Sequence, residues 1–341
     1  MPATAREGNG EPKVVTTMAV IETEGLRKEY RRARRGKTVA LDGLDLSVPE
    51  GGVFGFLGPN GAGKTTTIRC LLGLIRPSSG RCALLGAQRH VELAGVIGRV
   101  GSIVETPALY PRFSGRRNLE LLGRIAGIGR SRVAEVLQQV GLADRADDLV
   151  KTYSLGMRQR LGIGAALFKD PELLILDEPA NGLDPAGIVE VRDLIRRLGR
   201  EGRTVFVSSH ILSEVQQTAD RVAILSRGRA VAAGPVDEVL SAGRVAGLIA
   251  RVDDVPAGLR ALRGAGIGAE ATDGLLRVEL PPEEAARVTR TLADLGLYLT
   301  ELRPDAVDLE TVFLELTAPP PGTDAASIGV DASPPQGTET R

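Results

Sequence analysis

A glycine-rich loop at residues 58–65 constrains the fold of this chain more than any other feature of its sequence. The loop reads Gly-Pro-Asn-Gly-Ala-Gly-Lys-Thr, fits the pattern G-x-x-x-x-G-K-[S/T], and follows an apolar run expected to be a strand, Val53–Leu57. Such a loop turns backbone N–H groups inward around phosphate oxygens. The helix after it, expected at Lys64–Ile75, directs its positive dipole end at the same anion. An α/β fold with a nucleotide-phosphate site is therefore expected.

The residue types of the loop suggest separate roles. Lys64 is long enough to reach the β- and γ-phosphates, and the hydroxyl of Thr65 can ligate Mg²⁺. The residues expected to hold the phosphates are Gly58, Pro59, Asn60, Gly61, Ala62, Gly63, Lys64, Thr65 and Thr66.

Two carboxylates follow a second apolar strand, Leu173–Leu176. Asp177, at the end of the strand, is expected to hold Mg²⁺ directly or through water. The side chain of Glu178 should point the other way, as successive side chains on a strand do. From there it could polarise an attacking water as general base. The expected catalytic residues thus include Lys64 and Glu178.

Further apolar runs extend the sheet. Strands are expected at Thr204–Ser208 and Arg221–Leu225, and their alternation with helical segments is typical of a parallel sheet with helical crossovers. An Arg-rich, more helical stretch at about 87–160 predicts an inserted helical subdomain. These segments together define an expected nucleotide-binding domain at 19–235.

The pattern of expected strands and helices changes after Gly234-Pro235. Residues 245–317 are expected to form a small α+β extension, without His, Cys or Lys and so poorly equipped for catalysis. Its expected elements, in order, are a strand at Leu248–Val252, a helix at Gly258–Ala265, a strand pair around Asp273-Gly274, a helix at Glu283–Leu295, a strand at Leu297–Leu302 and a helix at Leu309–Leu316. Residues 1–18 and 318–341 are expected to be a disordered leader and tail, with Met18 a candidate start.

Composition excludes several classes of protein. The chain has 43 basic and 43 acidic residues, which argues against a strongly cationic nucleic-acid binder. Its longest apolar run, Leu161–Phe168, is far shorter than the ~18 residues of a membrane span. Cys70 and Cys82 form no CxxC pair and are expected to be small buried hydrophobes, and His90 is expected in solvent. The absence of an apolar signal segment favours a cytoplasmic location.

Four further motifs resemble those of the ATP-binding-cassette (ABC) ATPases. Tyr-Ser-Leu-Gly-Met at 153–157 resembles the signature sequence, Asn-Gly-Leu-Asp at 181–184 the D-loop, and Ser-Ser-His at 208–210 the switch histidine. Tyr30 stands where the family places an aromatic ring. All occur in the family's order across about residues 20–235, so the resemblance implies a P-loop NTPase fold of the ABC nucleotide-binding type.

The resemblance also implies ATP and Mg²⁺ as ligands, and a head-to-tail homodimer that encloses two ATP molecules. Ser154 and Gly156 would contact the γ-phosphate bound by Lys64 of the partner subunit. A small-residue turn before a helix at Arg158–Phe168 independently suggests a second anion site there. His210 would hydrogen-bond the γ-phosphate and position the water. The remaining nucleotide contacts it implies are Tyr30, stacked on adenine, and Asp184.

The chain departs from the family pattern at two places. Leu155 and Met157 replace a glycine and the glutamine of the usual signature. Glu105 replaces the Q-loop glutamine, and its carboxylate could face the metal directly or through water. Metal contacts are therefore expected from Thr65, Asp177 and Glu105. With these departures, the chain resembles the branch of the family that contains antibiotic-resistance and bacitracin-type exporter ATPases.

The function expected is that of an ATP-hydrolysing subunit, peripheral on the inner face of the cell membrane, that powers a separate membrane permease. Export of a drug, antibiotic or other amphipathic substrate is favoured over import. The alternatives are a soluble ABC ATPase acting on ribosomes or nucleic acid, and a regulatory nucleotide-binding protein without turnover. The extension could stabilise a dimer or bind a regulatory ligand. The basic residues around Tyr30 could be a solvated loop or attract ATP or anionic lipid.

Overall fold

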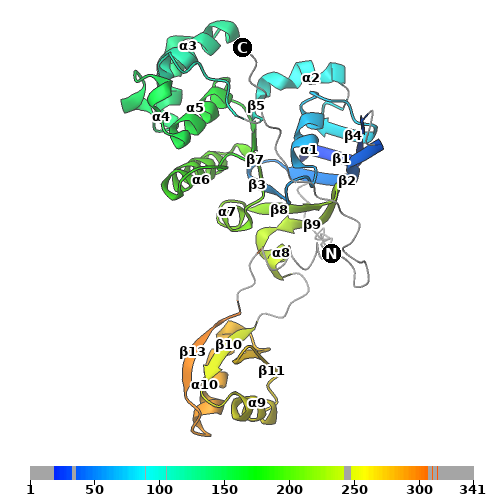
Figure 1. The fold of residues 1–341 in the computed structure, drawn as a ribbon, viewed down its shortest axis with the longest axis vertical. Helices are drawn as coiled ribbons and strands as arrows, with labels where there is room; N and C mark the ends of the chain where they lie inside the picture. Colours follow the sequence, from blue (N-terminus) through cyan, green and yellow to red (C-terminus); the bar gives the residue numbers. More distant parts are fainter. Residues whose placement is uncertain are drawn as a thin grey trace, which may run out of the picture.

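The computed structural model describes residues 19–32, 36–88, 90–104, 106–241, 247–305, 309 and 313. A larger body carries the glycine-rich loop, and a small domain lies below it in Figure 1. The expected leader, the expected tail and Glu105 lie outside the described residues, as does the side chain of His90. Within the described ranges, no helix has both the length and the apolar character needed to cross a membrane.

A six-stranded sheet in the order β5-β6-β7-β3-β8-β9 forms the centre of the larger body. Its first five strands pair in parallel and β9 is antiparallel to β8. All four strands expected from apolar runs are present in it. The bounds are β3 Gly52–Leu57, β5 Val100–Ile103, β6 Leu173–Asp177, β7 Thr204–Ser209, β8 Arg221–Ser226 and β9 Arg229–Pro235.

Helix α1 (Lys64–Leu71) lies between this sheet and a second, antiparallel sheet (Figure 1). One apolar cluster joins α1 to both sheets, through side chains such as Ile68, Phe206 and Leu44. The helix ends at Leu71 and not at Ile75 as expected, because Gly73 takes a left-handed φ of 69°. The second sheet has the order β2-β1-β4, with β1 at Ala19–Arg32, β2 at Gly36–Pro49 and β4 at Ser79–Leu84.

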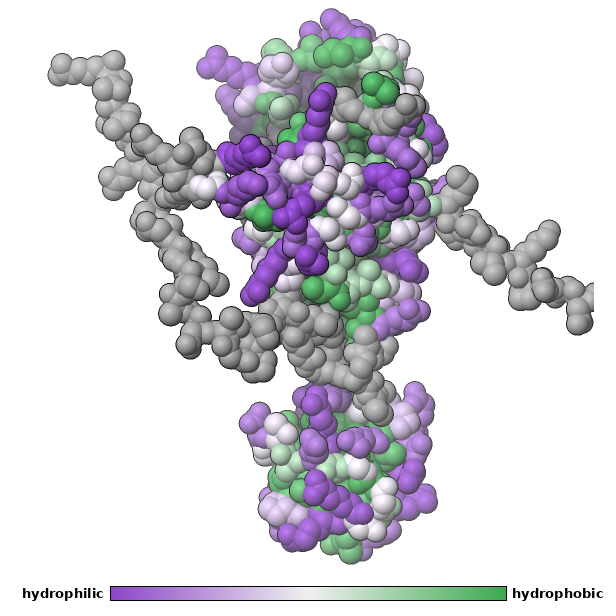
Figure 2. All heavy atoms as spheres, turned by 90° about the vertical axis from the view of Figure 1, so that its right-hand side faces the viewer, coloured by the Kyte–Doolittle hydropathy of each residue, from purple (hydrophilic) through white to green (hydrophobic). Residues whose placement is uncertain are grey.

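Figure 2 shows mostly hydrophilic side chains over this second sheet. The basic residues near Tyr30 have local partners there. Arg27 pairs with Glu29 at 3.0 Å and also with Asp42, and the Lys28 ammonium donates to the Arg76 carbonyl at 2.7 Å. The Arg27 guanidinium holds the pKa of the Glu29 carboxyl below its ordinary value. Arg27 and Lys28 therefore lie on strand β1 and not in a solvated loop as expected, and both have local partners.

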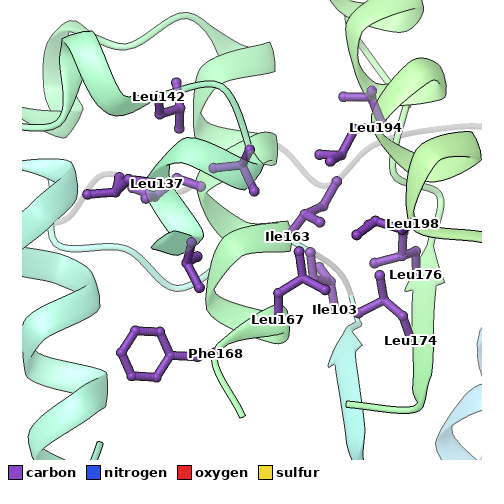
Figure 3. Close-up of a cluster of buried hydrophobic side chains, with 14 of the residues drawn as sticks. Ile103, Leu137, Leu142, Ile163, Leu167, Phe168, Leu174, Leu176, Leu194 and Leu198 are labelled. Carbon is purple, nitrogen blue, oxygen red and sulfur yellow. The ribbon is translucent and has the colours of Figure 1, made fainter. Parts of the chain in front are cut away.

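Three helices pack beyond the β5 edge of the central sheet: α3 (Gly115–Ala126), α4 (Arg130–Gln139) and α5 (Leu155–Leu167). Their shared core continues to the sheet through Ile163, Leu167 and Leu174 (Figure 3). The expected helical stretch at 87–160 needs one correction: after α2 (His90–Val96) it contains β5, a strand of the central sheet. The short apolar segment of β5 pairs with β6 as a strand and is not part of a helix.

The remaining α-helices of the larger body lie beside β3, β8 and β9, the last three strands in the order of the central sheet. They are α6 (Pro185–Arg200), α7 (Leu212–Gln216) and α8 (Val236–Ser241). The loop between β7 and α7 contains His210.

The small domain has the chain order β-α-β-β-α-β and the sheet order β11-β12-β10-β13, the split βαβ arrangement. Its elements match the kinds and order expected from the sequence, with ends that differ by a few residues. Of the final expected helix, only Leu309 and Phe313 are described, and both are helical. The bounds are β10 Leu248–Val252, α9 Val255–Gly264, β11 Ala269–Thr272, β12 Leu275–Val278, α10 Ala285–Ala293 and β13 Leu299–Pro304.

Candidate active site

The glycine-rich loop joins the end of β3 to the start of α1, at the edge where the carboxyl ends of the parallel strands meet. Gly63 caps α1 with a φ of 114°, a conformation that side chains rarely adopt. A Cβ atom at Gly63 would also lie 2.6 Å from the Ala40 carbonyl oxygen of β2. Position 63 therefore requires glycine for two reasons, and β2 helps to fix the loop.

Lys64 is only 6% exposed, and burying an ammonium group costs free energy unless it has polar partners. It donates to the Gly58 carbonyl at 2.6 Å and to the Pro59 carbonyl at 3.3 Å. Its Nζ also lies 3.1 Å from Oε1 of Glu178. The structure therefore brings together two of the three residues expected to be catalytic.

Glu178 links Lys64 to the third, because its Oε2 lies 2.7 Å from Nδ1 of His210. The reason for its placement differs from the expected one. β6 ends at Asp177, and Glu178 has a left-handed φ of 50°, so a turn and not strand alternation directs its side chain. Non-glycine residues held at such angles cost about 1–3 kcal/mol and cluster at functional sites.

Ser208, the penultimate residue of β7, holds both acidic residues in place. It lies opposite Asp177 in the parallel register, and its hydroxyl donates to Oδ1 of that buried carboxylate at 2.5 Å. The same oxygen accepts the Glu178 N–H at 3.0 Å. Reasoning from the sequence did not assign this role to Ser208. The available signal was a serine at the end of a buried strand next to the strand that ends in Asp177.

The metal ligands expected from the sequence are divided between two elements. Asp177 is buried at the end of β6, and Thr65 is half-buried in the first turn of α1. Among the described residues, no group of three or more His, Cys, Asp and Glu side chains could hold a metal ion. These oxygen donors suit Mg²⁺, which is usually bound by one or two protein ligands plus phosphates and water.

The signature segment forms a helix start of its own. Ser154 caps α5, accepting the Met157 N–H at 3.1 Å, so the helix begins at Leu155 and not at Arg158 as expected. A Cβ atom on Gly156 would lie 3.5 Å from Cα of Gly187, which places the start of α5 beside the start of α6. In the part of the chain that the structure describes, no hydrogen bond or ion pair joins Ser154 to Lys64, Glu178 or His210.

Asp184 and Tyr30 have local contacts. Asp184 caps α6, accepting the Gly187 N–H at 3.2 Å. Tyr30 lies opposite Thr38 in the second sheet, and its ring has the Lys28 ammonium 5.2 Å from its centre. These contacts explain how both side chains are held in this structure, and their proposed nucleotide contacts stay predictions.

Glu214, in α7, adds a further charged side chain near Glu178 and His210. It lines an enclosed crevice between α6 and α7 together with Glu178 and Arg192. Burial raises the pKa of the Glu214 carboxyl, and the nearby Glu178 carboxylate raises it further. The two cysteines behave as expected: Cys70 is buried and Cys82 half-buried. Burial raises the pKa of Cys70 to about 11 and also raises the pKa of Cys82.

An apolar groove is lined by β5, the residues after Glu105, α3 and α5. Ile125, 85% exposed, and Leu122 contribute from α3, and Phe168 lies at the end of α5. A Cβ atom on Gly162 of α5 would lie 2.3 Å from Cγ of Pro107. The segment after Glu105 therefore packs directly on the helix that begins at the signature.

Comparisons with known proteins show the family to which the chain is similar. A family model described as ABC transporter matches residues 41–181. The chain is 38% identical over 301 residues to the bacitracin transport ATP-binding protein BcrA of Enterococcus faecalis, covering 87% of this chain and 96% of that protein. It is 39% identical over 313 residues to the daunorubicin/doxorubicin resistance ATP-binding protein DrrA of Streptomyces peucetius, covering 88% and 93%.

Among solved structures, cbiO1 from Clostridium perfringens, part of the ABC transporter complex cbiONQ, aligns with a TM-score of 0.59. The sequence identity is 27%, and the alignment covers 66% of this chain and 91% of that one.

Proposed function

The chain belongs to the ABC transporter family as an ATP-binding subunit that hydrolyses ATP, and we propose that Lys64, Glu178 and His210 form its hydrolytic centre. The observation that supports this most strongly is the position of the Glu178 carboxylate, between the Lys64 ammonium and the His210 ring. A carboxylate held in this way, next to a phosphate-binding loop, is suited to act as a general base.

Each residue of the centre has one task in the proposed reaction. The loop N–H groups and Lys64 bind the β- and γ-phosphates. Glu178 accepts a proton from water as the water oxygen bonds to the γ-phosphorus and the bond to the bridging oxygen breaks, giving ADP and phosphate. His210 orients the Glu178 carboxylate and stabilises charge on the γ-phosphate. Ser208 keeps Asp177 and Glu178 in register.

We further propose that Thr65, Asp177 and Glu105 hold Mg²⁺ together with the phosphates. The ion would neutralise charge on the phosphate oxygens. Thr65 lies in the helix that follows β3, and Asp177 ends β6. Both strands end at the same edge of the parallel sheet, which supports this assignment.

ATP is proposed to be enclosed by two copies of the chain arranged head to tail. Ser154 and Gly156 start a helix, whose N–H groups and dipole suit an anion, and they make no hydrogen bond or ion pair with Lys64 in the described part of the chain. A second copy would bring this helix start to the γ-phosphate. Asp184, beside it at the start of α6, would lie at the same interface, and Tyr30 would stack on the adenine.

The groove between β5 and α3 is proposed to receive a cytoplasmic segment of a separate membrane permease. Its exposed apolar side chains Leu122 and Ile125 suit an apolar helix face, and the Pro107–Gly162 contact links the groove to the signature helix. The subunit would then work at the inner face of the membrane. The relatives named for bacitracin transport and daunorubicin resistance support export of a drug, antibiotic or other amphipathic substrate.

The Glu178→Gln substitution tests the hydrolytic centre. It keeps the side-chain shape and removes the base, so the ATPase rate should fall by about 100-fold or more while ATP still binds. Equilibrium binding of a fluorescent ATP analogue and phosphate release would be measured together. Glu172→Gln, on the exposed Arg99 ion pair at the start of the same strand, is the matched control and should hydrolyse ATP at the parental rate. Brisk hydrolysis by Glu178→Gln would refute the assignment.

A further inference from the structure

Helix α7 packs tightly against the strand that leads into the phosphate loop. It begins two residues after His210, so its position sets the position of the histidine. A Cβ atom on Gly55 of β3 would lie 2.2 Å from Cγ1 of Val215 in α7. One side of α7 is therefore fixed against the sheet with almost no clearance.

Val215 also belongs to an apolar group that we call the α7 cluster. Its buried members are Leu57, Val215, Val222, Ile224, Val236, Val239 and Leu309. Six of the seven come from the larger body. Leu309 follows the small domain in the chain, yet it is 0% exposed and lies inside this cluster.

Two more contacts attach the same segment to α7. Phe313, four positions after Leu309, also packs against the α7 cluster, and both residues are helical. The Leu309 N–H donates to Oε1 of Gln216, the last residue of α7, at 3.2 Å. The chain beyond the small domain thus returns to the helix next to His210.

The small domain is consequently tied to the α7 cluster at both ends. Its entry follows α8, whose Val236 and Val239 are cluster members, and its exit leads to Leu309. Entry and exit leave the domain side by side, because the Asp305 N–H donates to the Gly247 carbonyl at 2.8 Å. A movement of the domain would act on the cluster through both connections.

We propose that Leu309 and Phe313 form a latch through which the small domain positions α7 and, with it, His210. The latch residues are positioning residues: they touch α7 and not the nucleotide. The proposal rests on the proposed role of His210 in hydrolysis. It gives the small domain a regulatory role in ATP turnover, which acts through α7, the helix that follows His210.

The Leu309→Ala substitution in the full-length chain tests the latch. Loss of a fully buried side chain loosens α7, so amide exchange of residues 212–216 should accelerate. The kcat for ATP should fall about tenfold with KM unchanged, since a slightly misplaced reactive group costs rate more than binding. Leu309→Met, which conserves volume, should restore both values. Leu295→Ala, the same change at a residue of the small domain that is 64% exposed, should alter neither.

Two results would overturn the latch. The first is that Leu309→Ala keeps both the parental kcat and the parental rate of amide exchange in α7. The other is faster exchange throughout the central sheet with loss of ATP affinity, which would show a general structural role. Should Leu309→Ala fail to fold, Gln216→Ala removes the hydrogen-bond acceptor alone and should shift α7 exchange and kcat in the same direction. Parental turnover in His210→Ala would instead refute the proposed hydrolytic role, while α7 exchange would still report on the latch.

Discussion

At the scale of single residues, the site depends on a serine as much as on its charged groups. Ser208 contacts both acidic residues through one oxygen, accepting the Glu178 N–H and donating to Asp177. Lys64 and His210 then hold the Glu178 carboxylate from two sides. The charged side chains can therefore act together only while the neighbouring strand β7 keeps its register with β6.

Replacing Ser208 with alanine should slow ATP hydrolysis without abolishing ATP binding. Asp177 would lose its buried donor, at a cost of about 1–3 kcal/mol, and the turn at Glu178 would loosen. We expect kcat to fall about tenfold, which corresponds to ~1.4 kcal/mol of barrier. Thr23→Ala is the control, since it removes a similar buried hydrogen bond, to the Leu44 carbonyl, in the second sheet. Thr23→Ala should lower stability but leave kcat unchanged; equal kcat values for the two variants would contradict this role of Ser208.

The thiol of Cys70 should be almost unreactive in the folded protein. Burial raises its pKa to about 11 from an ordinary value of 9.0. At pH 8 only about one thiol in a thousand is then the reactive thiolate. Native protein at pH 8 should therefore react with iodoacetamide far more slowly than protein unfolded in guanidinium. Since the folded pKa is the raised one, stability should be unaffected below about pH 9 and fall above it as the unfolded thiol ionises. Rapid stoichiometric labelling of Cys70 in the native state would contradict its burial.

At the scale of elements, the sequence predicts what local composition controls. The buried parallel strands are continuous apolar runs, so β3, β6, β7 and β8 were found within a residue or so of their ends. β5 was missed because its four residues carry too little pattern to separate a strand from a helix.

The end of β6 shows the limit of such prediction. The left-handed turn at Glu178 depends on a hydrogen bond to Ser208 of another strand, which local pattern does not locate. The cap at Ser154 is local, since its partner is the Met157 N–H three residues later, and a serine is a usual signal for a helix start. The sequence thus predicts the proposed catalytic residues as residue types in a known order, but not their contacts with one another. The packing of Leu309 on α7 joins residues about 90 positions apart and leaves no local signal.

Gly63→Ala tests how β2 shapes the phosphate loop. Alanine at a φ of 114° is strained by about 1–3 kcal/mol, and its Cβ would collide with the Ala40 carbonyl. ATP affinity should therefore fall at least tenfold, measured by binding of a fluorescent ATP analogue. Gly98→Ala, at a position with ordinary φ and open space, is the control and should bind ATP normally. Unchanged affinity in Gly63→Ala would show that the loop reshapes freely on binding.

At the scale of the whole molecule, the larger body contains two helix starts of a kind suited to an anion. One, at α1, carries Lys64 and the proposed hydrolytic centre. The other, at α5, carries Ser154 and Gly156 without a hydrogen bond or ion pair to that centre in the part of the chain described. The small domain is attached behind α7 at both of its ends. This arrangement suits a subunit that hydrolyses ATP only when two copies associate, and in which the small domain acts on His210 through α7.

The composite site is tested most directly by mixing two inactive variants, Lys64→Ala and Gly156→Asp, and measuring phosphate release in a single turnover. In a head-to-tail dimer, a mixed pair has one complete site, formed by the intact Lys64 of one chain and the intact signature of the other. With random pairing about a quarter of the parental sites should be restored, so phosphate should appear in the mixture and in neither variant alone. A mixture that releases no more phosphate than the two separate variants would contradict the composite site.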